Sequence, residues 1–123
     1  MARMQSLKRG DVVWVNLDPT VGREIQKRRP CVVVSLSVLN EKRLTVVVVP
    51  LSTGSTPRPP LVVAVPSAGA GSNARIDQIR AVDKSRVLDT AGKLNRADME
   101  QVEQGLRTVL GHKSDVGHLH DQR

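Results

Sequence analysis

The sequence of 123 residues contains no phenylalanine and no tyrosine, and Trp14 is its only aromatic residue. A platform of several aromatic rings, on which nucleic-acid binders commonly stack bases, is therefore excluded. Trp14 itself lies in a run of valines and is expected to fill the core. Any base selection by this chain has to rest on hydrogen bonds and on arginine planes.

Cysteine and long apolar runs are also scarce. The single cysteine, Cys31, cannot form an internal disulfide, which suits a reducing compartment, and we expect it to be a small core residue. No apolar run approaches the roughly 20 residues that span a bilayer, and the N-terminus lacks the long apolar core of a signal peptide. We therefore expect a cytoplasmic protein with no membrane segment.

Acidic residues are outnumbered by basic ones. The chain has 19 Lys and Arg against 12 Asp and Glu, which gives a formal net charge of +7. Polyanions are the partners to expect first, although charge alone does not separate RNA, DNA and an acidic protein. The length and a hydrophobic content of 39% fit one compact domain, and the sequence contains no internal repeat or linker.

The apolar pattern predicts a mainly β protein with one helix near its end. Runs rich in β-branched residues predict strands over residues 12–17, 31–35, 44–49 and 61–65, and a further strand pair over 73–80 and 81–87. Asn95 is the predicted N-cap of a helix that ends at Gly111 and is expected to pack on the core. Successive short strands without intervening helices favour a small antiparallel sheet or barrel.

The two ends of the chain are polar. We expect one domain over residues 8–111, with flexible ends at 1–7 and 112–123. Three histidines in the C-terminal tail invite a metal interpretation, but the tail has no cysteine and no predicted rigid element to fix them. A solvated tail without a metal site is the expected arrangement for His112, His118 and His120.

The strongest local pattern is a charged loop between the first two predicted strands. The segments around it read RGDVVWVNLDP (9–19) and KRRPCVVVS (27–35). Arg23 and Glu24 lie in the loop, and a basic cluster of Lys27, Arg28 and Arg29 directly precedes the second strand. These charges are predicted to gather at the mouth of a sheet, where a phosphate could be held.

Four motifs in order along the chain carry a family resemblance. RGDVVWVNLDP (9–19), RPCVVVS (29–35), VPLST (49–53) and DQIR (77–80) resemble the successive motifs of the MazF/PemK/Kid toxins, the messenger-RNA interferases of toxin–antitoxin modules. The resemblance implies a small SH3-like barrel of the CcdB/MazF type with a C-terminal helix. It also implies a homodimer, single-stranded RNA as substrate and an acidic antitoxin as partner.

The resemblance further implies a reaction without metal or cofactor. The ribose 2′-OH attacks the adjacent phosphorus and leaves a 2′,3′-cyclic phosphate and a 5′-OH. Arg29 and Thr53 match the catalytic positions of the family. A guanidinium is a planar fork of donors suited to the charged transition state, so Arg29 is expected to hold the phosphate oxygens as a clamp. If Arg29 also transfers a proton, we expect it to act as an acid and not as a base. The Thr53 hydroxyl can donate to a phosphate oxygen or accept from an attacking group.

Other residues are expected at the same site. Two interpretations of Glu24 stay open. It is either a general base with a raised pKa or a solvated charge that offsets Arg23 and Lys27. Gln78 corresponds to a family position near the RNA, and Arg80 adds a phosphate contact or is one of the alternating charges of an exposed strand. The full set expected to bind RNA is Arg23, Lys27, Arg28, Ser52, Gln78 and Arg80.

Two other functions stay open from the sequence. The first is a non-enzymatic toxin of the same fold that resembles the gyrase poison CcdB and acts by binding a protein. That family relies on a Trp-Gly-Ile ending, whereas this chain ends in Asp-Gln-Arg. The second is a basic barrel that binds RNA without cleaving it.

Overall fold

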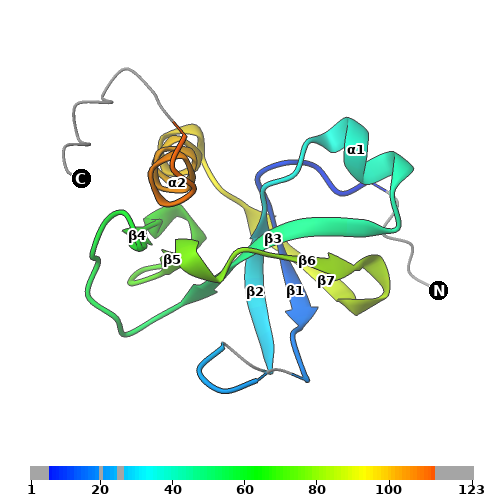
Figure 1. The fold of residues 1–123 in the computed structure, drawn as a ribbon, viewed down its shortest axis with the longest axis horizontal. Helices are drawn as coiled ribbons and strands as arrows, with labels where there is room; N and C mark the ends of the chain where they lie inside the picture. Colours follow the sequence, from blue (N-terminus) through cyan, green and yellow to red (C-terminus); the bar gives the residue numbers. More distant parts are fainter. Residues whose placement is uncertain (1–5, 20, 25–26, 113–123) are drawn as a thin grey trace.

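The computed structural model describes residues 6–19, 21–24 and 27–112. Figure 1 shows two groups of strands that are connected by the long strand β3, with helix α2 above one group and α1 beside the other. The strands are β1 (Asp11–Asn16), β2 (Arg28–Val33), β3 (Thr45–Ser52), β4 (Val62–Ala64), β5 (Asn73–Arg75), β6 (Arg80–Asp83) and β7 (Val87–Lys93). The helices are α1 (Ser37–Lys42) and α2 (Arg96–Val109), with short 3-10 turns η1 (Pro66–Ala68), η2 (Ile76–Gln78) and η3 (Lys84–Arg86).

All strand pairs described are antiparallel. The order across the sheet is β4-β5-β3-β2-β1-β7, and β6 pairs with the first half of β3. β6 and β7 lie at different edges, yet Val82 and Val87 from these strands share one core, so the sheet curls around it. The described strands do not close this curl, because β7 pairs with β1 and β6 with β3. The expected antiparallel, barrel-like sheet with a C-terminal helix is confirmed.

Alternation along the strands divides the apolar side chains between two cores. In β1, for example, Val13 and Val15 face one core and Val12 faces the other. The barrel core consists of Leu7, Val13, Val15, Leu17, Cys31, Val33, Val46, Val48, Val82 and Val87. The helix core consists of Val12, Val32, Val49, Leu51, Val63, Val65, Ala74, Ile76, Leu94, Met99 and Val102.

Helix α2 begins and ends where the sequence predicts. The Asn95 side chain accepts a hydrogen bond from the Asp98 amide at 2.8 Å, and Gly111 follows the helix with φ +76°. Met99 and Val102 are buried in the helix core, which confirms the expected core packing. At Gly105 the helix approaches η2 so closely that a Cβ would lie 3.1 Å from the side chain of Ile76. This contact fixes η2 and the residues that follow it.

Residues 73–87 differ from the predicted strand pair. β5 and β6 pair with β3 instead of with each other, and η2 and η3 interrupt the predicted strands. The reason is that one edge of β3 is long enough to accept both short strands.

The sequence pattern does not predict β7, in which only the first residue is buried, or α1, in which only Asn40 is buried. Neither element has the periodic apolar face on which such a prediction depends.

The N-terminal boundary also differs. Leu7, which the sequence places in a flexible end, is 3% exposed and belongs to the barrel core. Its carbonyl oxygen accepts a hydrogen bond from the Asn40 side chain at 3.0 Å. The expectations for residues 1–5 and 113–123 fall outside the described part of the chain.

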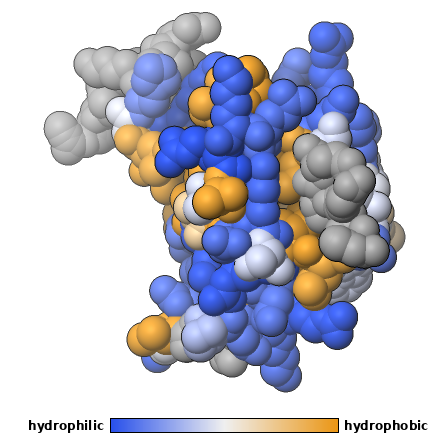
Figure 2. All heavy atoms as spheres, turned by 90° about the vertical axis from the view of Figure 1, so that its right-hand side faces the viewer, coloured by the Kyte–Doolittle hydropathy of each residue, from blue (hydrophilic) through white to orange (hydrophobic). Residues whose placement is uncertain are grey.

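The surface is mostly polar. Figure 2 shows the end of the molecule that carries α1, where apolar side chains gather in separate patches within a largely hydrophilic surface. Exposed apolar residues near α1 are Leu36, Val38, Leu39 and Leu44. Among the described residues, no helix combines the length and the apolar character needed to cross a membrane.

A pair of leucines tests the barrel core. Leu17 is fully buried and Leu44 is 80% exposed. Leu17→Ala is expected to lower the free energy of unfolding by about 2–5 kcal/mol, because it removes buried methyl groups and leaves a cavity. The matched change Leu44→Ala should stay within about 0.5 kcal/mol of the parent. Urea unfolding measures both, and equal losses would contradict the assignment of Leu17 to the core.

Candidate active site

The loop between β1 and β2 is anchored by backbone contacts at its base. The Leu17 amide donates to the Lys27 carbonyl at 3.0 Å, and the Lys27 amide donates to the Asp18 carboxylate at 2.8 Å. Arg86 donates to the carbonyl oxygens of Asn16 and Asp18 from η3. Lys27 has φ 70°, a left-handed backbone conformation that these contacts hold in place. The charged loop therefore starts and ends at fixed positions.

Glu24 and Arg23 lie exposed in this loop. The carboxylate of Glu24 accepts a hydrogen bond from the Val21 amide at 2.8 Å, so one of its oxygens stabilises the local turn. Glu24 also lines a cavity of about 450 Å³ with Gln78 and Arg80. The structure thus brings Glu24 to two of the residues expected to bind RNA, and both interpretations of its carboxylate stay open.

The basic cluster of Lys27, Arg28 and Arg29 is divided by the alternation of β2. Arg29 pairs with Val15 and shares the face of Cys31, whereas Arg28 pairs with Asn16 and shares the face of Trp14. Arg29 is half-buried and its two neighbours are exposed. The two arginines therefore lie on opposite faces of the strand, and Arg29 is the one on the face of the barrel core.

The positive charges of Arg80 and Arg29 both lower the pKa of the Cys31 thiol. Burial raises the pKa of Cys31 to about 12, and the positive charges of Arg80 and then Arg29 oppose this shift. Arg80 is opposite Val48 in the pairing of β6 with β3, and Cys31 is opposite Pro50 in the pairing of β2 with β3. Two guanidinium groups thus converge from different strands on one end of the barrel core.

Ser52 and Thr53 lie where β3 ends. Ser52 comes two residues after Pro50 on the same face of β3, and Arg29 comes two residues before Cys31 on β2. Because Cys31 and Pro50 are paired in antiparallel strands, both side chains lie at the same end of the ladder. The Ser52 hydroxyl oxygen is buried and has no hydrogen-bond partner, a state that is rare for a polar group. Thr53 is exposed and begins the next loop, as expected.

The loop after Thr53 is tied to β5. Buried Asn73 donates from its side-chain amide to the Ser55 carbonyl at 2.7 Å. Ser52 is paired with Asn73 in the ladder, so this bond holds the loop close to the end of β3. Gly54 has φ +84°, which lets the chain turn away directly after Thr53.

The cavity also includes a residue that the sequence analysis did not select. Asp77 lines it together with Gln78, Ile79 and Arg80, while Arg29 and Thr53 lie outside its lining. Asp77 is exposed on η2, which is seated on α2 through Ile76. Its position next to Gln78 in the motif DQIR was the signal that could have identified it.

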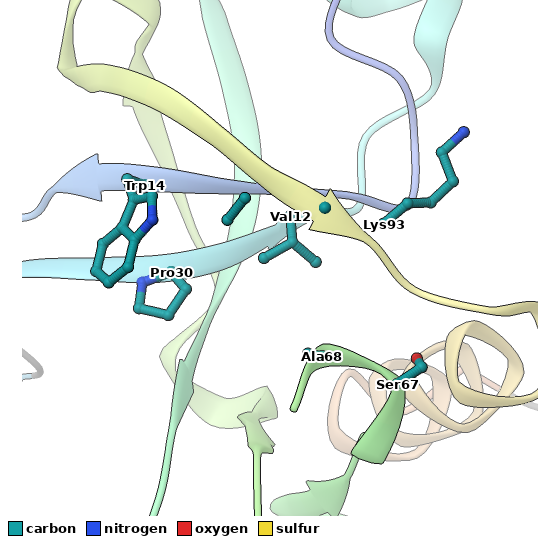
Figure 3. Close-up of a pocket in the computed structure, with 8 residues that line it drawn as sticks. Val12, Trp14, Pro30, Ser67, Ala68 and Lys93 are labelled. Atoms are coloured by element: carbon teal, nitrogen blue, oxygen red, sulfur yellow. The ribbon is translucent and has the colours of Figure 1, made fainter. Parts of the chain in front are cut away.

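The expectation that Trp14 fills the core is wrong. Its side chain is 42% exposed and lies beside Pro30, with which it is paired across β1 and β2. Figure 3 shows both residues on one wall of a cavity of about 370 Å³, with Ser67 and Ala68 of η1 on the opposite side. Val13 and Val15 take the face of the barrel core, and Trp14 lies on the other face with Asn16, beyond the helix core that buries Val12.

No metal centre is formed by the part of the chain that the structure describes. Within these residues, no group of three or more His, Cys, Asp or Glu side chains lies close enough to hold an ion. His112 is exposed, and His118 and His120 fall outside the described ranges.

Known proteins are similar to this chain in sequence and in fold. Residues 8–110 match the family described as PemK-like, MazF-like toxin of type II toxin–antitoxin system. Endoribonuclease PemK of Escherichia coli is 32% identical over 88% of this chain and 85% of that protein. Endoribonuclease MazF9 of Mycobacterium tuberculosis (H37Rv) is 29% identical over 85% of this chain and 96% of that protein. The crystal structure of MazF from Deinococcus radiodurans has a TM-score of 0.77 at 25% identity and covers 86% and 97% of the two chains.

The curled antiparallel sheet with its C-terminal helix is thus a fold of the MazF type. The chain belongs to the PemK-like, MazF-like toxin family of type II toxin–antitoxin systems. The resemblance carried by the four motifs is confirmed, and the family match spans almost the whole expected domain.

The Cys31 thiol provides a test of the site's packing. Its pKa is raised from 9.0 to about 12, mainly by burial, so the thiol stays neutral at pH 8 in the folded protein. A chromogenic disulfide reagent should react with Cys31 slowly at pH 8 and rapidly after unfolding in urea. Between about pH 9 and 12 the unfolded thiol ionises first, so this group lowers folding stability as the pH rises. Rapid reaction of the native protein would contradict the burial of Cys31.

Proposed function

We propose that this chain is a sequence-selective endoribonuclease toxin that cleaves single-stranded messenger RNA and is inhibited by an acidic antitoxin. The proposed products carry 2′,3′-cyclic phosphate and 5′-OH ends, and the reaction needs no metal or cofactor. The protein acts in the cytoplasm as a homodimer. Support for RNA cleavage comes from the family assignment and from relatives that are named endoribonucleases.

The convergence of Arg29 and Arg80 at the end of the barrel core, next to Ser52 and Thr53, is the observation that carries this proposal. Arg29, Arg80 and Ser52 combine positive charge with a hydroxyl donor on one face of the sheet, and Thr53 adds a second hydroxyl at the start of the adjoining loop. A phosphodiester passing through the reaction gathers negative charge on its non-bridging oxygens. Arg29 is assigned as the clamp on that charge, because its planar fork can hold two oxygens at once.

The hydroxyl groups are assigned to the same phosphate. Thr53 donates to a phosphate oxygen, and Ser52 has a hydroxyl oxygen with no protein partner that substrate can satisfy. The 2′-oxygen forms a bond to phosphorus while the bond from phosphorus to the 5′-oxygen breaks. A base takes the proton of the 2′-OH, and the departing 5′-oxygen gains a proton.

Glu24 is the candidate for the base. It lies in the loop over the cavity that Gln78 and Arg80 also line, which gives a carboxylate access to a ribose bound there. Gln78 supplies an amide for a base edge, and Arg23 and Lys27 supply positive charge along the exposed loop. Arg28 is assigned to backbone contacts on the opposite face of β2.

Inhibition by the antitoxin follows from charge and from membership of a toxin–antitoxin family. An acidic, partly disordered chain is attracted to a protein of net charge +7 and can cover a large area as it orders. The names of the relatives favour RNA cleavage over a gyrase poison of the same fold or a barrel that only binds RNA.

Replacing Arg29 tests the catalytic clamp. Arg29→Ala is expected to lower the rate of RNA cleavage by at least about 100-fold, because a donor to the transition-state charge is lost. The parent should cut a pool of single-stranded transcripts in the presence of EDTA, and sequencing of the new ends reports the target motif. Arg43→Ala, an exposed arginine that follows α1, is the matched control and should cut like the parent. Intact RNA after long incubation with the parent would refute the proposal.

Replacing Glu24 separates its two interpretations. If the carboxylate is the base, Glu24→Gln lowers the maximal cleavage rate by about 100-fold to 10,000-fold and leaves affinity for an uncleavable RNA unchanged. Glu41→Gln, an exposed change on α1, is the control. A rate within about twofold of the parent assigns Glu24 to the loop turn with Val21.

A further inference from the structure

Exposed apolar side chains are concentrated at α1. Four of the nine large apolar residues that are exposed in the described part of the chain lie within residues 36–44, and each of the four is at least 47% exposed. They are Leu36, Val38, Leu39 and Leu44, which we call the α1 patch. Figure 2 shows apolar side chains at this end of the molecule between hydrophilic ones. Single exposed apolar residues are ordinary, but a group of them indicates a surface for interaction.

The outward direction of the α1 patch is fixed by Asn40. The Asn40 side chain is buried and donates to the carbonyl oxygens of Leu7 at 3.0 Å and of Ser35 at 3.1 Å. Each residue of a helix turns by about 100°, so side chains two positions away lie on the opposite side. Val38 and Lys42 therefore point away from the molecule for as long as Asn40 keeps its contacts.

Basic side chains border the α1 patch. Lys42 and Arg43 are exposed where α1 ends, and the Lys84 amide donates at 2.9 Å to the segment that follows this helix. The nearby acidic residues are Glu41 and Asp83, so positive charges outnumber negative ones at this end. Within the described ranges, neither Lys42 nor Arg43 forms an ion pair. Their charges are therefore available to a negatively charged partner.

The α1 patch lies far from the candidate active site. α1 follows β2 and precedes β3, whereas Arg29 lies near the start of β2 and Ser52 at the end of β3. Figure 1 shows α1 projecting beside one end of β3, with β4 and β5 at the other end. A strand rises by about 3.3 Å per residue, so β3 alone separates the two surfaces by roughly 20 Å. A partner bound at α1 leaves the candidate active site open.

We propose that the α1 patch binds the surface of membranes that contain anionic lipids. Its four apolar side chains enter the boundary between head groups and acyl chains, and Lys42 and Arg43 contact the phosphates of the head groups. Such binding is reversible and needs no segment that spans the bilayer. The inference goes beyond the proposed function and does not depend on it.

The shape and the charge of the α1 patch favour a lipid surface over a protein. Peptides are commonly bound in grooves or along sheet edges, whereas α1 projects from the molecule (Figure 1). A second copy of this chain would set Lys42 and Arg43 against the same residues of its partner, and like charges repel. An anionic membrane surface accepts a projecting apolar group and attracts the basic side chains beside it.

Vesicle sedimentation tests this binding. The full chain is mixed with unilamellar vesicles of phosphatidylcholine that contain about 30% phosphatidylglycerol, and vesicles of pure phosphatidylcholine are the comparison. At low salt the parent should bind the anionic vesicles at least about tenfold more tightly, and added salt should reduce this difference. Val38→Ser and Leu39→Ser should each weaken binding to the anionic vesicles about fivefold, because apolar area is lost from the contact.

Matched changes of charge complete the experiment. Lys42→Ala and Arg43→Ala are each expected to weaken binding to the anionic vesicles about fivefold. Arg107→Ala removes the same charge from an exposed position of α2, and Leu110→Ser changes an exposed leucine directly after α2. Both of these controls should bind like the parent. Thermal unfolding of every variant verifies that the fold is intact.

The outcomes decide between the possible partners. Equal binding to both kinds of vesicle, or binding to neither, overturns the proposal. Equal losses in Arg43→Ala and Arg107→Ala would assign the attraction to the net charge of the protein and also overturn it. Self-association that Val38→Ser abolishes, without vesicle binding, would assign the α1 patch to a second copy and overturn it as well.

The test is independent of RNA cleavage, because the vesicles carry no RNA. A parent that binds anionic vesicles through α1 but never cuts RNA refutes the nuclease assignment and supports the lipid site. A parent that cuts RNA but ignores the vesicles overturns the lipid site alone.

Discussion

Strand β3 is hydrogen-bonded along both edges, and this double pairing constrains the whole molecule. One edge pairs with β2, and the other pairs first with β6 and then with β5. Because consecutive side chains of a strand point to opposite faces, its valines and Leu51 supply both the barrel core and the helix core. The same alternation delivers Ser52 to the face of Arg29 and leaves Thr53 at the first position of the loop. The chemistry of the site is thus positioned by elements that cannot shift without disturbing a core.

The features that the sequence predicts correctly are those with a strong local period or a strong local cap. The alternating valines of β1, the β-branched runs of β2 and β3, and the Asn95 cap of α2 all carry enough information within a few residues. The catalytic assignments came from the order of four motifs and not from any one of them. Such motifs name positions along the chain, and the strand register then determines which of those positions share a face.

The features that could not be predicted depend on pairing over long distances. β5 and β6 are short, and their partner is decided by the free edge of β3, about which residues 73–83 carry no signal. Trp14 was misassigned because residue type was weighed above the period of its strand, although Asn16 on the same face already indicated exposure. The placement of Arg58 and Arg75 on either side of Val62 is also invisible in the sequence, because β4 and η1 lie between the two arginines along the chain.

The charge balance at the end of the barrel core explains why a thiol is suited to the position of Cys31. Arg29 and Arg80 approach this side chain, and burial keeps the pKa of the thiol at about 12, so no negative charge forms there at neutral pH. A carboxylate in the same place would pair with the guanidinium groups and occupy the donors that we propose for a phosphate. A neutral residue fills the core and leaves the positive potential directed at the surface. Packing of the barrel and attraction of a polyanion are therefore served by one uncharged side chain.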